Sequence, residues 1–282
     1  MSEIQYEDLI SNYGDPKLIF KGGQRVVFIV DHPIYGDIAL KIGDYQTEAN
    51  PKGWDINRIQ REIEILKKID SPYYPKNFNF ELLPESSRYI IYEEFIESTP
   101  LSKCMDKFTN PIDILELIRS TTTGLNVLWV QKIVHRDLKP DNILINQNNE
   151  PVIIDLGITR NLEADSLTQT ILGGPHTPEY AAPELLIYNK NDINHRTDQF
   201  SLGIIFIQLL LKGKHPFSPS LVGGTTIREN IVNDRWYSQI FNEDDLLPLR
   251  NLGHKCLGHR CCDRFRTPEM LMREINGCLE VL

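Results

Sequence analysis

Four polar side chains between positions 137 and 155 have the types that phosphoryl transfer requires. They are two carboxylates, one cation and one amide, contributed by Asp137, Asp155, Lys139 and Asn142. This reaction needs little covalent help, but the phosphate, its metal ions and the accepting hydroxyl must be held in line while charge spreads over the oxygens. A carboxylate can take the hydroxyl proton, and a lysine can reach the travelling phosphate. Carboxylate and amide oxygens suit magnesium, which takes oxygen ligands.

The order of residues around these side chains resembles a known signature. Residues 135–142 read HRDLKPDN, and residues 155–157 read DLG after a predicted short hairpin. The combination is similar to the catalytic loop and metal-binding triplet of the eukaryotic-type serine/threonine protein kinases, in which Phe is usual where Leu156 stands. The hairpin is expected to bring Asn142 and Asp155 to the same end of a two-stranded ribbon.

The resemblance implies a role for each of the four side chains. Asp137 is expected to orient and deprotonate the substrate hydroxyl, and Lys139 to steady the travelling phosphate. Asn142 and Asp155 are expected to hold Mg²⁺, with Mn²⁺ as an alternative metal, beside the phosphates of ATP. The expected activity is phosphorylation of serine and threonine hydroxyls on proteins, including the chain itself.

A glycine pair between two apolar, β-branched runs predicts a tight turn between two strands. Glycine lets backbone N–H groups approach phosphate oxygens without a side chain in the way. By resemblance to the kinase glycine-rich loop, Gly22, followed by Gly23, stands at the middle glycine, and Val27 stands at the valine that covers the base. Phe20 and Arg25 replace the outer two glycines, and one hypothesis is that Arg25 contacts a phosphate itself.

A lysine in a short apolar strand and a glutamate in the following helix are further candidates. Lys41 lies in the apolar run 38–42, where a cation is costly unless it is paired. Apolar residues at helical spacing predict a helix over residues 55–69, with Glu62 beside its apolar stripe. By resemblance, Lys41 holds the α- and β-phosphates of ATP and Glu62 pairs with it; Glu64 is the alternative partner.

The largely apolar run 89–96, in which Glu93 and Glu94 follow the apolar residues 89–92, resembles the strand that enters the hinge between the two kinase lobes. The resemblance implies that Tyr92 lies behind the adenine pocket. Backbone groups from Glu93 to Phe95 are expected to bond the adenine edge.

The region after the catalytic loop resembles a kinase activation segment, residues 155–184. Thr177 and Lys139 match positions typical of kinases that act on serine or threonine. Arg136 is a cation that a phosphate on this segment could satisfy. The candidate phosphorylation sites are Ser166, Thr168 and Thr170, with an unmodified solvated loop as the alternative.

Two helices are predicted to support this region. Asn110 followed by Pro111 is a good helix start, and one buried face is expected from Ile114, Leu117, Ile118, Thr121, Leu125 and Leu128. A second, almost uniformly apolar helix is expected to begin near Asp198, which by resemblance holds the catalytic loop by its backbone. Arg264 is similar to the arginine that pairs with the glutamate at Glu184, and Arg266 is its rival.

Composition narrows the class of protein. The formal charge of −9 over 282 residues argues against a general binder of nucleic acid or of anionic membranes. The apolar run 202–211 is about half of the roughly 20 residues that span a bilayer, and the first residues lack an export signal, so a cytoplasmic protein is expected. Five cysteines without disulfide-framework spacing fit a reducing compartment. The His and Cys residues at 254–262 match no standard zinc pattern and are interpreted as core filler, with a metal site as the alternative.

We therefore expect an α+β, two-lobed protein kinase-like fold and a stand-alone catalytic domain. Residues 1–95 are expected to form a small ATP-binding lobe, an antiparallel β-sheet with one regulatory helix, and residues 96–282 a mainly α-helical lobe. The expected partners are protein substrates, with transient self-association for autophosphorylation. One alternative is a pseudokinase scaffold that binds nucleotide without turnover, although no catalytic residue is lost outside the glycine-rich loop. Another is a small-molecule phosphotransferase, a class that generally lacks the Ala182-Pro183-Glu184 segment.

Overall fold

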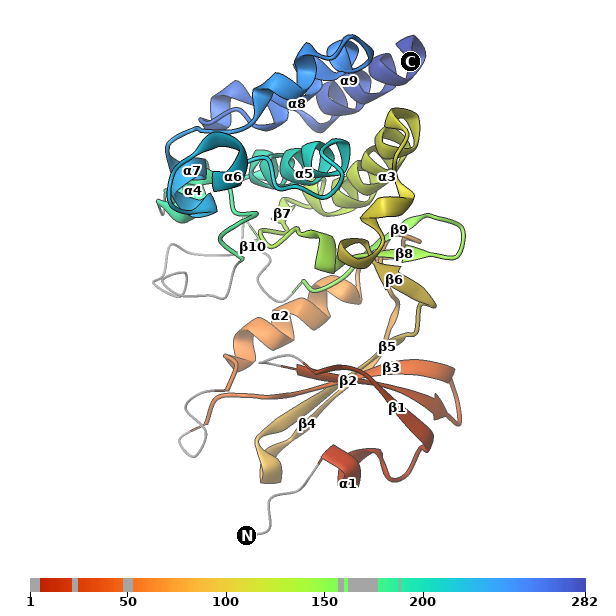
Figure 1. Cartoon of the computed structure of the whole chain (residues 1–282). Helices are drawn as coiled ribbons and strands as arrows, with labels where there is room; N and C mark the ends of the chain where they lie inside the picture. The colour runs from red at the N-terminus through yellow and green to blue at the C-terminus, as the bar shows by residue number, and fades with distance from the viewer. Residues whose placement is uncertain (1–5, 22–24, 48–52, 157–159, 162–176, 188) are drawn as a thin grey trace. The chain divides into compact units, whose positions relative to one another are not determined.

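The chain divides into two compact units, Met1–Glu97 and Ser98–Leu282. The first is built on a β-sheet, and the second is mainly helical (Figure 1). The structure is a computed structural model, and it describes residues 6–21, 25–47, 53–156, 160–161, 177–187 and 189–282.

The first unit contains a five-stranded antiparallel sheet with the strand order β1-β2-β3-β5-β4. Its elements are α1 (Tyr6–Ile10), β1 (Gly14–Lys21), β2 (Arg25–His32), β3 (Gly36–Asp44), α2 (Ile56–Leu66), β4 (Asn77–Leu83), the 3₁₀ turn η1 (Pro84–Ser86) and β5 (Arg88–Glu94). Sequential strands pair except that β5 inserts between β3 and β4, so β3 is the central strand and β2 and β5 are its neighbours.

Side chains alternate between the two faces of this sheet, and each face packs against a different helix. One face packs with α1 through a buried cluster that includes Leu40 and Tyr92. The other face packs with α2 through Tyr89 and Ile91. Because Lys41 follows Leu40 in β3 and pairs with Ile91, its side chain projects from the α2 face.

Helix α2 forms because its apolar residues recur at helical spacing and its first turn is capped. The Asp55 side chain accepts a hydrogen bond from the backbone N–H of Asn57 at 2.9 Å. Ile59 and Ile63 are buried, and Glu62 beside them is only 1% exposed. The helix predicted over residues 55–69 is thus observed, with ends a few residues shorter.

The second unit is mainly helical and carries a small three-stranded sheet with the order β6-β8-β9. The strands of that sheet are β6 (Ser98–Pro100), β8 (Ile143–Asn146) and β9 (Pro151–Ile153). Two further strands of the unit, β7 (Ile133–Val134) and β10 (Arg160–Asn161), pair with each other. Its α-helices are α3 (Pro111–Trp129), α4 (Pro183–Leu186), α5 (His195–Leu210), α6 (Pro219–Val222), α7 (Ile227–Val232), α8 (Arg250–Cys256) and α9 (Pro268–Val281). Its 3₁₀ turns are η2 (Leu101–Lys103), η3 (Met105–Lys107), η4 (Pro140–Asn142), η5 (Lys190–Asp192), η6 (Ser238–Asn242), η7 (Asp244–Leu249) and η8 (Cys261–Asp263).

Helices α3 and α5 begin where the sequence predicts. The Asn110 side chain caps α3 by accepting a hydrogen bond from the N–H of Ile112 at 2.9 Å. Asn194 and Thr197 form a capping box at the start of α5, which is buried from Thr197 to Leu209. Within the part of the chain that the structure describes, no helix is long and apolar enough to cross a membrane.

Candidate active site

Asp198, fully buried in the first turn of α5, fixes the backbone that leads into the HRD segment. Its Oδ2 accepts hydrogen bonds from the His135 N–H at 2.9 Å and from the Trp129 indole at 2.8 Å. Its Oδ1 accepts one from the Arg136 N–H at 2.9 Å. Arg136 has a φ of 70°, a left-handed conformation that is costly for a non-glycine residue. Asp198 therefore holds a strained turn in place, as the resemblance implied.

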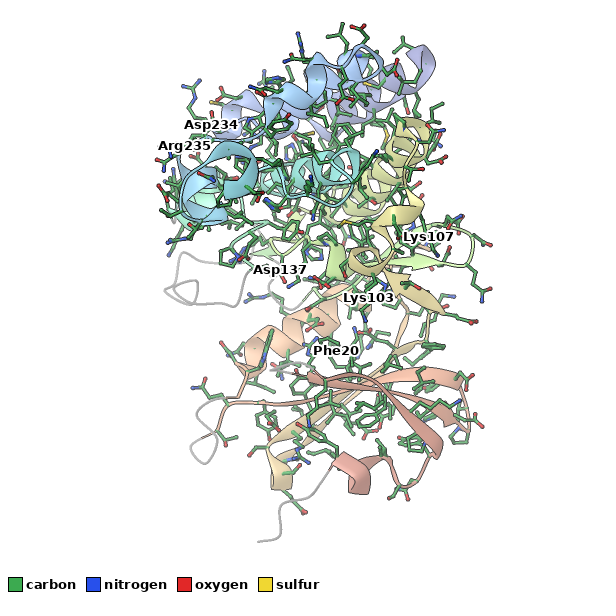
Figure 2. All side chains as sticks on the ribbon, in the orientation of Figure 1. Phe20, Lys103, Lys107, Asp137, Asp234 and Arg235 are labelled. Atoms are coloured by element: carbon green, nitrogen blue, oxygen red, sulfur yellow. The ribbon has the colours of Figure 1, made fainter. Side chains whose placement is uncertain are left out.

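Asp137 is the centre of a closed set of hydrogen bonds within the second unit. The Lys139 ammonium donates to Asp137 Oδ2 at 3.0 Å and to Thr177 Oγ1 at 2.7 Å. The Thr177 N–H donates to Asp137 Oδ1 at 3.2 Å, and Asn142 Nδ2 donates to Oδ2 at 3.2 Å. Asp137 is labelled in Figure 2 and is 9% exposed. Each of these side chains is thus oriented by another member of the set, which is the preorganisation that proton transfer requires.

Thr177 is a sensitive probe of this set because its hydroxyl receives the Lys139 ammonium. Replacing Thr177 by Val removes the hydroxyl at nearly constant shape. For the phosphoryl transfer that the resemblance implies, we expect the rate to fall roughly 10- to 100-fold, since a hydrogen bond to a charged group contributes about 1.5–3 kcal/mol. Thr177→Ser keeps the hydroxyl and is the matched control. Steady-state phosphorylation rates measure the effect, and equal rates for the two variants would contradict a role for the hydroxyl.

The hairpin of β8 and β9 brings the two expected metal ligands to one end of a ribbon. Ile143 pairs with Ile153, and the Ile154 N–H donates to the Asn142 carbonyl at 3.0 Å. Asp155 follows Ile154 directly, so it lies at the end of the ribbon that carries Asn142. Because Asn142 Nδ2 donates to Asp137, its amide oxygen is the atom that can ligate a metal. One amide oxygen and one carboxylate suit Mg²⁺.

Residues 177–184 are anchored to the helical unit by polar side chains. The Tyr180 hydroxyl donates to Gln208 Oε1 at 2.8 Å, and burial raises the pKa of Tyr180 to about 12. The Ser201 hydroxyl donates to the Tyr180 carbonyl at 2.8 Å. Burial lowers the pKa of His215 to about 4; its Nδ1 accepts from a backbone N–H, so the protonated Nε2 donates to the Glu179 carbonyl at 3.0 Å.

Glu184 and Arg264 form a buried, bidentate ion pair. Their two hydrogen bonds measure 2.6 Å and 2.9 Å, and the side chains are 4% and 0% exposed. The Thr197 hydroxyl also donates to Glu184, at 2.9 Å. The structure therefore identifies Arg264 as the partner of Glu184; the rival, Arg266, is exposed.

In the first unit, Glu62 of α2 binds Arg25 at the start of β2. Arg25 Nη1 donates to Glu62 Oε1 at 2.8 Å, and Nη2 donates to Oε2, so the contact is bidentate. Arg25 Nε donates to the Tyr89 hydroxyl at 2.7 Å, and the guanidinium lies 5.2 Å from the centre of the Trp54 ring. Arg25 pairs across the strands with Gly43, where a Cβ atom would lie 2.5 Å from the Tyr89 hydroxyl oxygen. Glycine at this position therefore makes room for the contact.

Lys41 pairs with Glu93, at the end of β5. Lys41 Nζ lies 2.5 Å from Glu93 Oε2, and the two side chains are 12% and 2% exposed. The strand register explains the pair: Ala39 is opposite Glu93 and Lys41 is opposite Ile91, so Lys41 and Glu93 are diagonal neighbours on one face. Burial raises the pKa of the Glu93 carboxyl, and the Lys41 charge opposes this shift.

A sequence profile of the protein kinase domain matches residues 21–273, nearly the whole chain. The chain belongs to the protein kinase domain family. The expected α+β fold is confirmed by this match together with the antiparallel sheet of the first unit and the helices of the second.

Serine/threonine kinases are among the curated relatives of this kinase domain. It is 31% identical over 174 residues to the serine/threonine-protein kinase pakH of Dictyostelium discoideum, covering 61% of this chain and 32% of that protein. It is 30% identical over 264 residues to the meiosis-specific serine/threonine-protein kinase mek1 of Schizosaccharomyces pombe, covering 84% and 56%. It is 30% identical over 211 residues to the serine/threonine-protein kinase kin-29 of Caenorhabditis elegans, covering 74% and 24%. The chain therefore spans about a quarter to just over half of these relatives.

Two expectations for the first unit of the kinase domain are wrong. Lys41 pairs with Glu93 rather than with Glu62, whose carboxylate is bonded to Arg25. Tyr92 does not share a face with Lys41: it pairs with Leu40, packs in the α1 cluster and lies 3.2 Å, oxygen to oxygen, from another tyrosine hydroxyl. Burial raises its pKa. Glu93, next in sequence, lies on the Lys41 face of the sheet.

The remaining predicted nucleotide contacts and the candidate phosphorylation sites stay predictions. Val27 pairs with Lys41 across β2 and β3, on the same face of the sheet. Phe20, labelled in Figure 2, is 57% exposed on β1. Phe95 directly follows β5. The other positions lie outside the described residues: Gly22, Gly23, Ser166, Thr168 and Thr170.

Most of the cysteine and histidine residues at 254–262 take part in packing, but Cys262 does not. Cys256 and Cys261 are buried, whereas Cys262 is exposed. His254 packs edge-on against Trp236, with 4.9 Å between ring centres. Among the residues that the structure describes, no three His, Cys, Asp or Glu side chains gather as a metal site.

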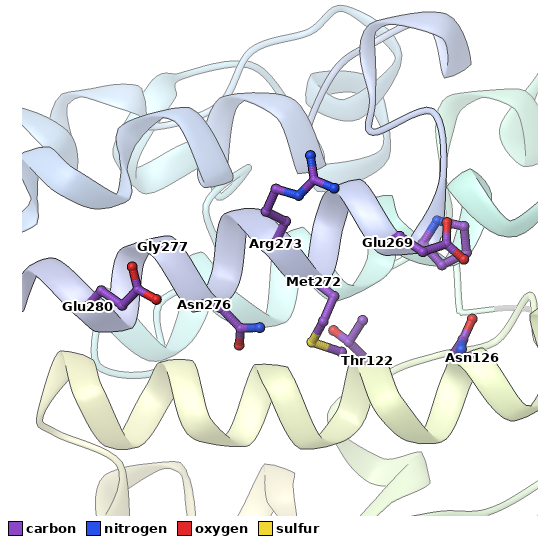
Figure 3. A pocket seen from close by; sticks show the side chains of 9 residues that line it. Thr122, Asn126, Glu269, Met272, Arg273, Asn276, Gly277 and Glu280 are labelled. Carbon is purple, nitrogen blue, oxygen red and sulfur yellow. The ribbon is translucent and has the colours of Figure 1, made fainter.

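A pocket of about 570 Å³ lies between α3 and α9 of the kinase domain (Figure 3). Its lining mixes amide, apolar and charged side chains, including Asn126, Met272, Arg273 and Glu280. None of its lining residues belongs to the Asp137 set, so it is separate from the candidate catalytic residues.

Proposed function

We propose that this chain is an ATP-dependent protein kinase that phosphorylates serine and threonine hydroxyls of proteins. The supporting observation is the closed set of hydrogen bonds among Asp137, Lys139, Asn142 and Thr177. Two further observations support a protein acceptor: the relatives are serine/threonine kinases, and residues 177–184 are firmly anchored.

In the proposed reaction, Asp137 orients the acceptor hydroxyl and takes its proton as the new bond between oxygen and the γ-phosphorus forms. The bond between the γ-phosphorus and the bridging oxygen breaks, and ADP leaves with that oxygen. Lys139 balances charge on the travelling phosphoryl group. Lys41 holds the α- and β-phosphates, while Val27, Phe95, Gly22 and Gly23 contact the rest of the nucleotide. Asn142 and Asp155 would hold Mg²⁺, which would neutralise phosphate charge when bound.

Autophosphorylation provides a direct test of the proposed activity. Purified protein incubated with ATP and Mg²⁺ is expected to gain mass in steps of one phosphate, with the modified residues among Ser166, Thr168 and Thr170. Intact-mass analysis measures the gain, and peptide mapping locates it. A sample with ATP and a metal chelator is the control. If neither the chain itself nor an added basic protein substrate gained phosphate, the proposed activity would be wrong.

A nucleotide-binding scaffold without turnover is the second candidate. The feature that favours it is the replacement of both outer glycines of the phosphate loop by Phe20 and Arg25. It predicts saturable binding of Mg²⁺-ATP without any mass gain, so the same sample distinguishes the two candidates.

A further inference from the structure

Two buried carboxylates and two partly buried cations lie together on the α2 face of the first unit, and they are paired in an unexpected way. Arg25 is joined to Glu62, and Lys41 is joined to Glu93. Each pair has one cation and one carboxylate, so both pairs are electrically balanced. The strand register creates this arrangement because Arg25, Lys41 and Glu93 come from three neighbouring strands and point to the same face.

The carboxylate of Glu62 already has a cationic partner, Arg25. Both of its carboxylate oxygens receive hydrogen bonds from Arg25 in the planar, two-pronged geometry that arginine favours. The Tyr89 hydroxyl and the Trp54 ring fix the guanidinium from other sides. Transferring Glu62 to Lys41 would break two charge-assisted hydrogen bonds inside a region where Glu62 is 1% exposed. The Arg25 contact therefore attaches α2 to the sheet and makes Arg25, not Lys41, the cationic partner of Glu62.

Glu93 is a carboxylate that packing alone does not explain. It is 1% exposed, and its Oε1 has no hydrogen-bond partner among the residues that the structure describes. A buried acceptor without a donor is costly, and an apolar residue of similar volume often replaces a buried ion pair without loss of stability. Its ion pair to Lys41 is the contact that accounts for a charge at this position.

We propose that Glu93 is the positioning residue for Lys41, the cation assigned to the ATP phosphates, and that Glu62 acts only through Arg25. This inference rests on the proposed function, because it assumes that Lys41 contacts the nucleotide. It gives the chain two neighbouring charge pairs with different tasks, one for the nucleotide cation and one for the α2 attachment.

Double-mutant cycles on the full chain test the assignment, with Mg²⁺-ATP as the probe and calorimetry as the measurement of Kd. Glu93→Gln keeps the shape of the side chain and is expected to weaken binding about tenfold or more. In a Lys41→Met background, the same change is expected to cause no further loss, because the cation that Glu93 positions is absent. Such non-additivity is the mark of directly coupled residues.

Glu62→Gln is the matched control. Its effect on Kd is expected to be the same with Lys41 or Met at position 41, and to disappear when Arg25 is replaced by Met. Coupling between Glu62 and Lys41, or tighter ATP binding by Glu93→Gln alone, would overturn the inference. The second result would mean that Glu93 merely repels the nucleotide.

The design separates this inference from the proposed function. If the unmodified chain neither binds Mg²⁺-ATP nor transfers phosphate, the proposed function fails. If it does both, but Lys41 is coupled to Glu62 and not to Glu93, only the assignment of Glu93 fails. Thermal unfolding checks that each variant is folded. Should Glu93→Gln not fold, Glu93→Asp serves in the same cycle, because it keeps the charge and moves it away from Lys41 Nζ by the length of one methylene group.

Discussion

Asp137→Asn is expected to lower the rate of phosphoryl transfer by roughly 100- to 10,000-fold, the range that a general base contributes. The amide cannot accept the hydroxyl proton. It is also poorly suited to its neighbours, because the two oxygens of Asp137 receive hydrogen bonds from Lys139, Asn142 and the Thr177 N–H. Whichever way the new amide is turned, its NH₂ group faces at least one of these donors. Single-turnover phosphorylation rates measure the loss, and calorimetry with Mg²⁺-ATP is expected to show that nucleotide binding remains.

Asp141→Asn is the matched control for this variant. Asp141 lies in the same loop but is exposed, and its side chain accepts a hydrogen bond from the Ser102 hydroxyl at 2.7 Å. An amide oxygen can accept that bond equally well, so rates close to those of the unmodified chain are expected. Asp137→Asn turning over as fast as Asp141→Asn would show that Asp137 is not the proton acceptor.

Arg264→Met is expected to destabilise the folded chain by about 3–5 kcal/mol, because it leaves the buried carboxylate of Glu184 without its cation. The pair is 0% and 4% exposed, so water cannot replace the lost contacts. Arg264 also donates to the carbonyls of Gly258 at 2.8 Å and Arg196 at 2.9 Å, and these bonds are lost as well. Denaturant unfolding measures the free energy of unfolding.

Two controls separate the ion pair from a general loss of positive charge. Arg266→Met removes an exposed arginine two positions away and is expected to change the free energy of unfolding by less than about 0.5 kcal/mol. Combining Arg264→Met with Glu184→Leu is expected to recover much of the loss, since both charges are then removed together. An Arg264→Met protein as stable as Arg266→Met would contradict the importance of the buried pair.

The sequence alone was sufficient for the catalytic loop and its supports because the decisive contacts there are local or follow from one strong pattern. Asn142 and Asp155 meet through a short hairpin, and the hydrogen bond between Ile154 and Asn142 follows from its register. The buried helix α5 was predictable from its uniform apolar composition, and its position fixes Asp198. In these cases the backbone N–H and C=O groups have few alternative hydrogen-bond partners.

Tertiary structure decided which charges meet in the first unit. A register shift of one residue moves a side chain to the opposite face of a sheet, and the register between β3 and β5 is set by packing between segments far apart in the chain. That register places Glu93 beside Lys41 and turns Tyr92 away. The space above Gly43 likewise allows Arg25 to take Glu62. Residue types and spacing were thus enough to predict the family and the loop around Asp137. The folded sheet determines which cation pairs with Glu62 and which with Glu93. Such pairs depend on sheet faces and interatomic distances, which no linear motif contains.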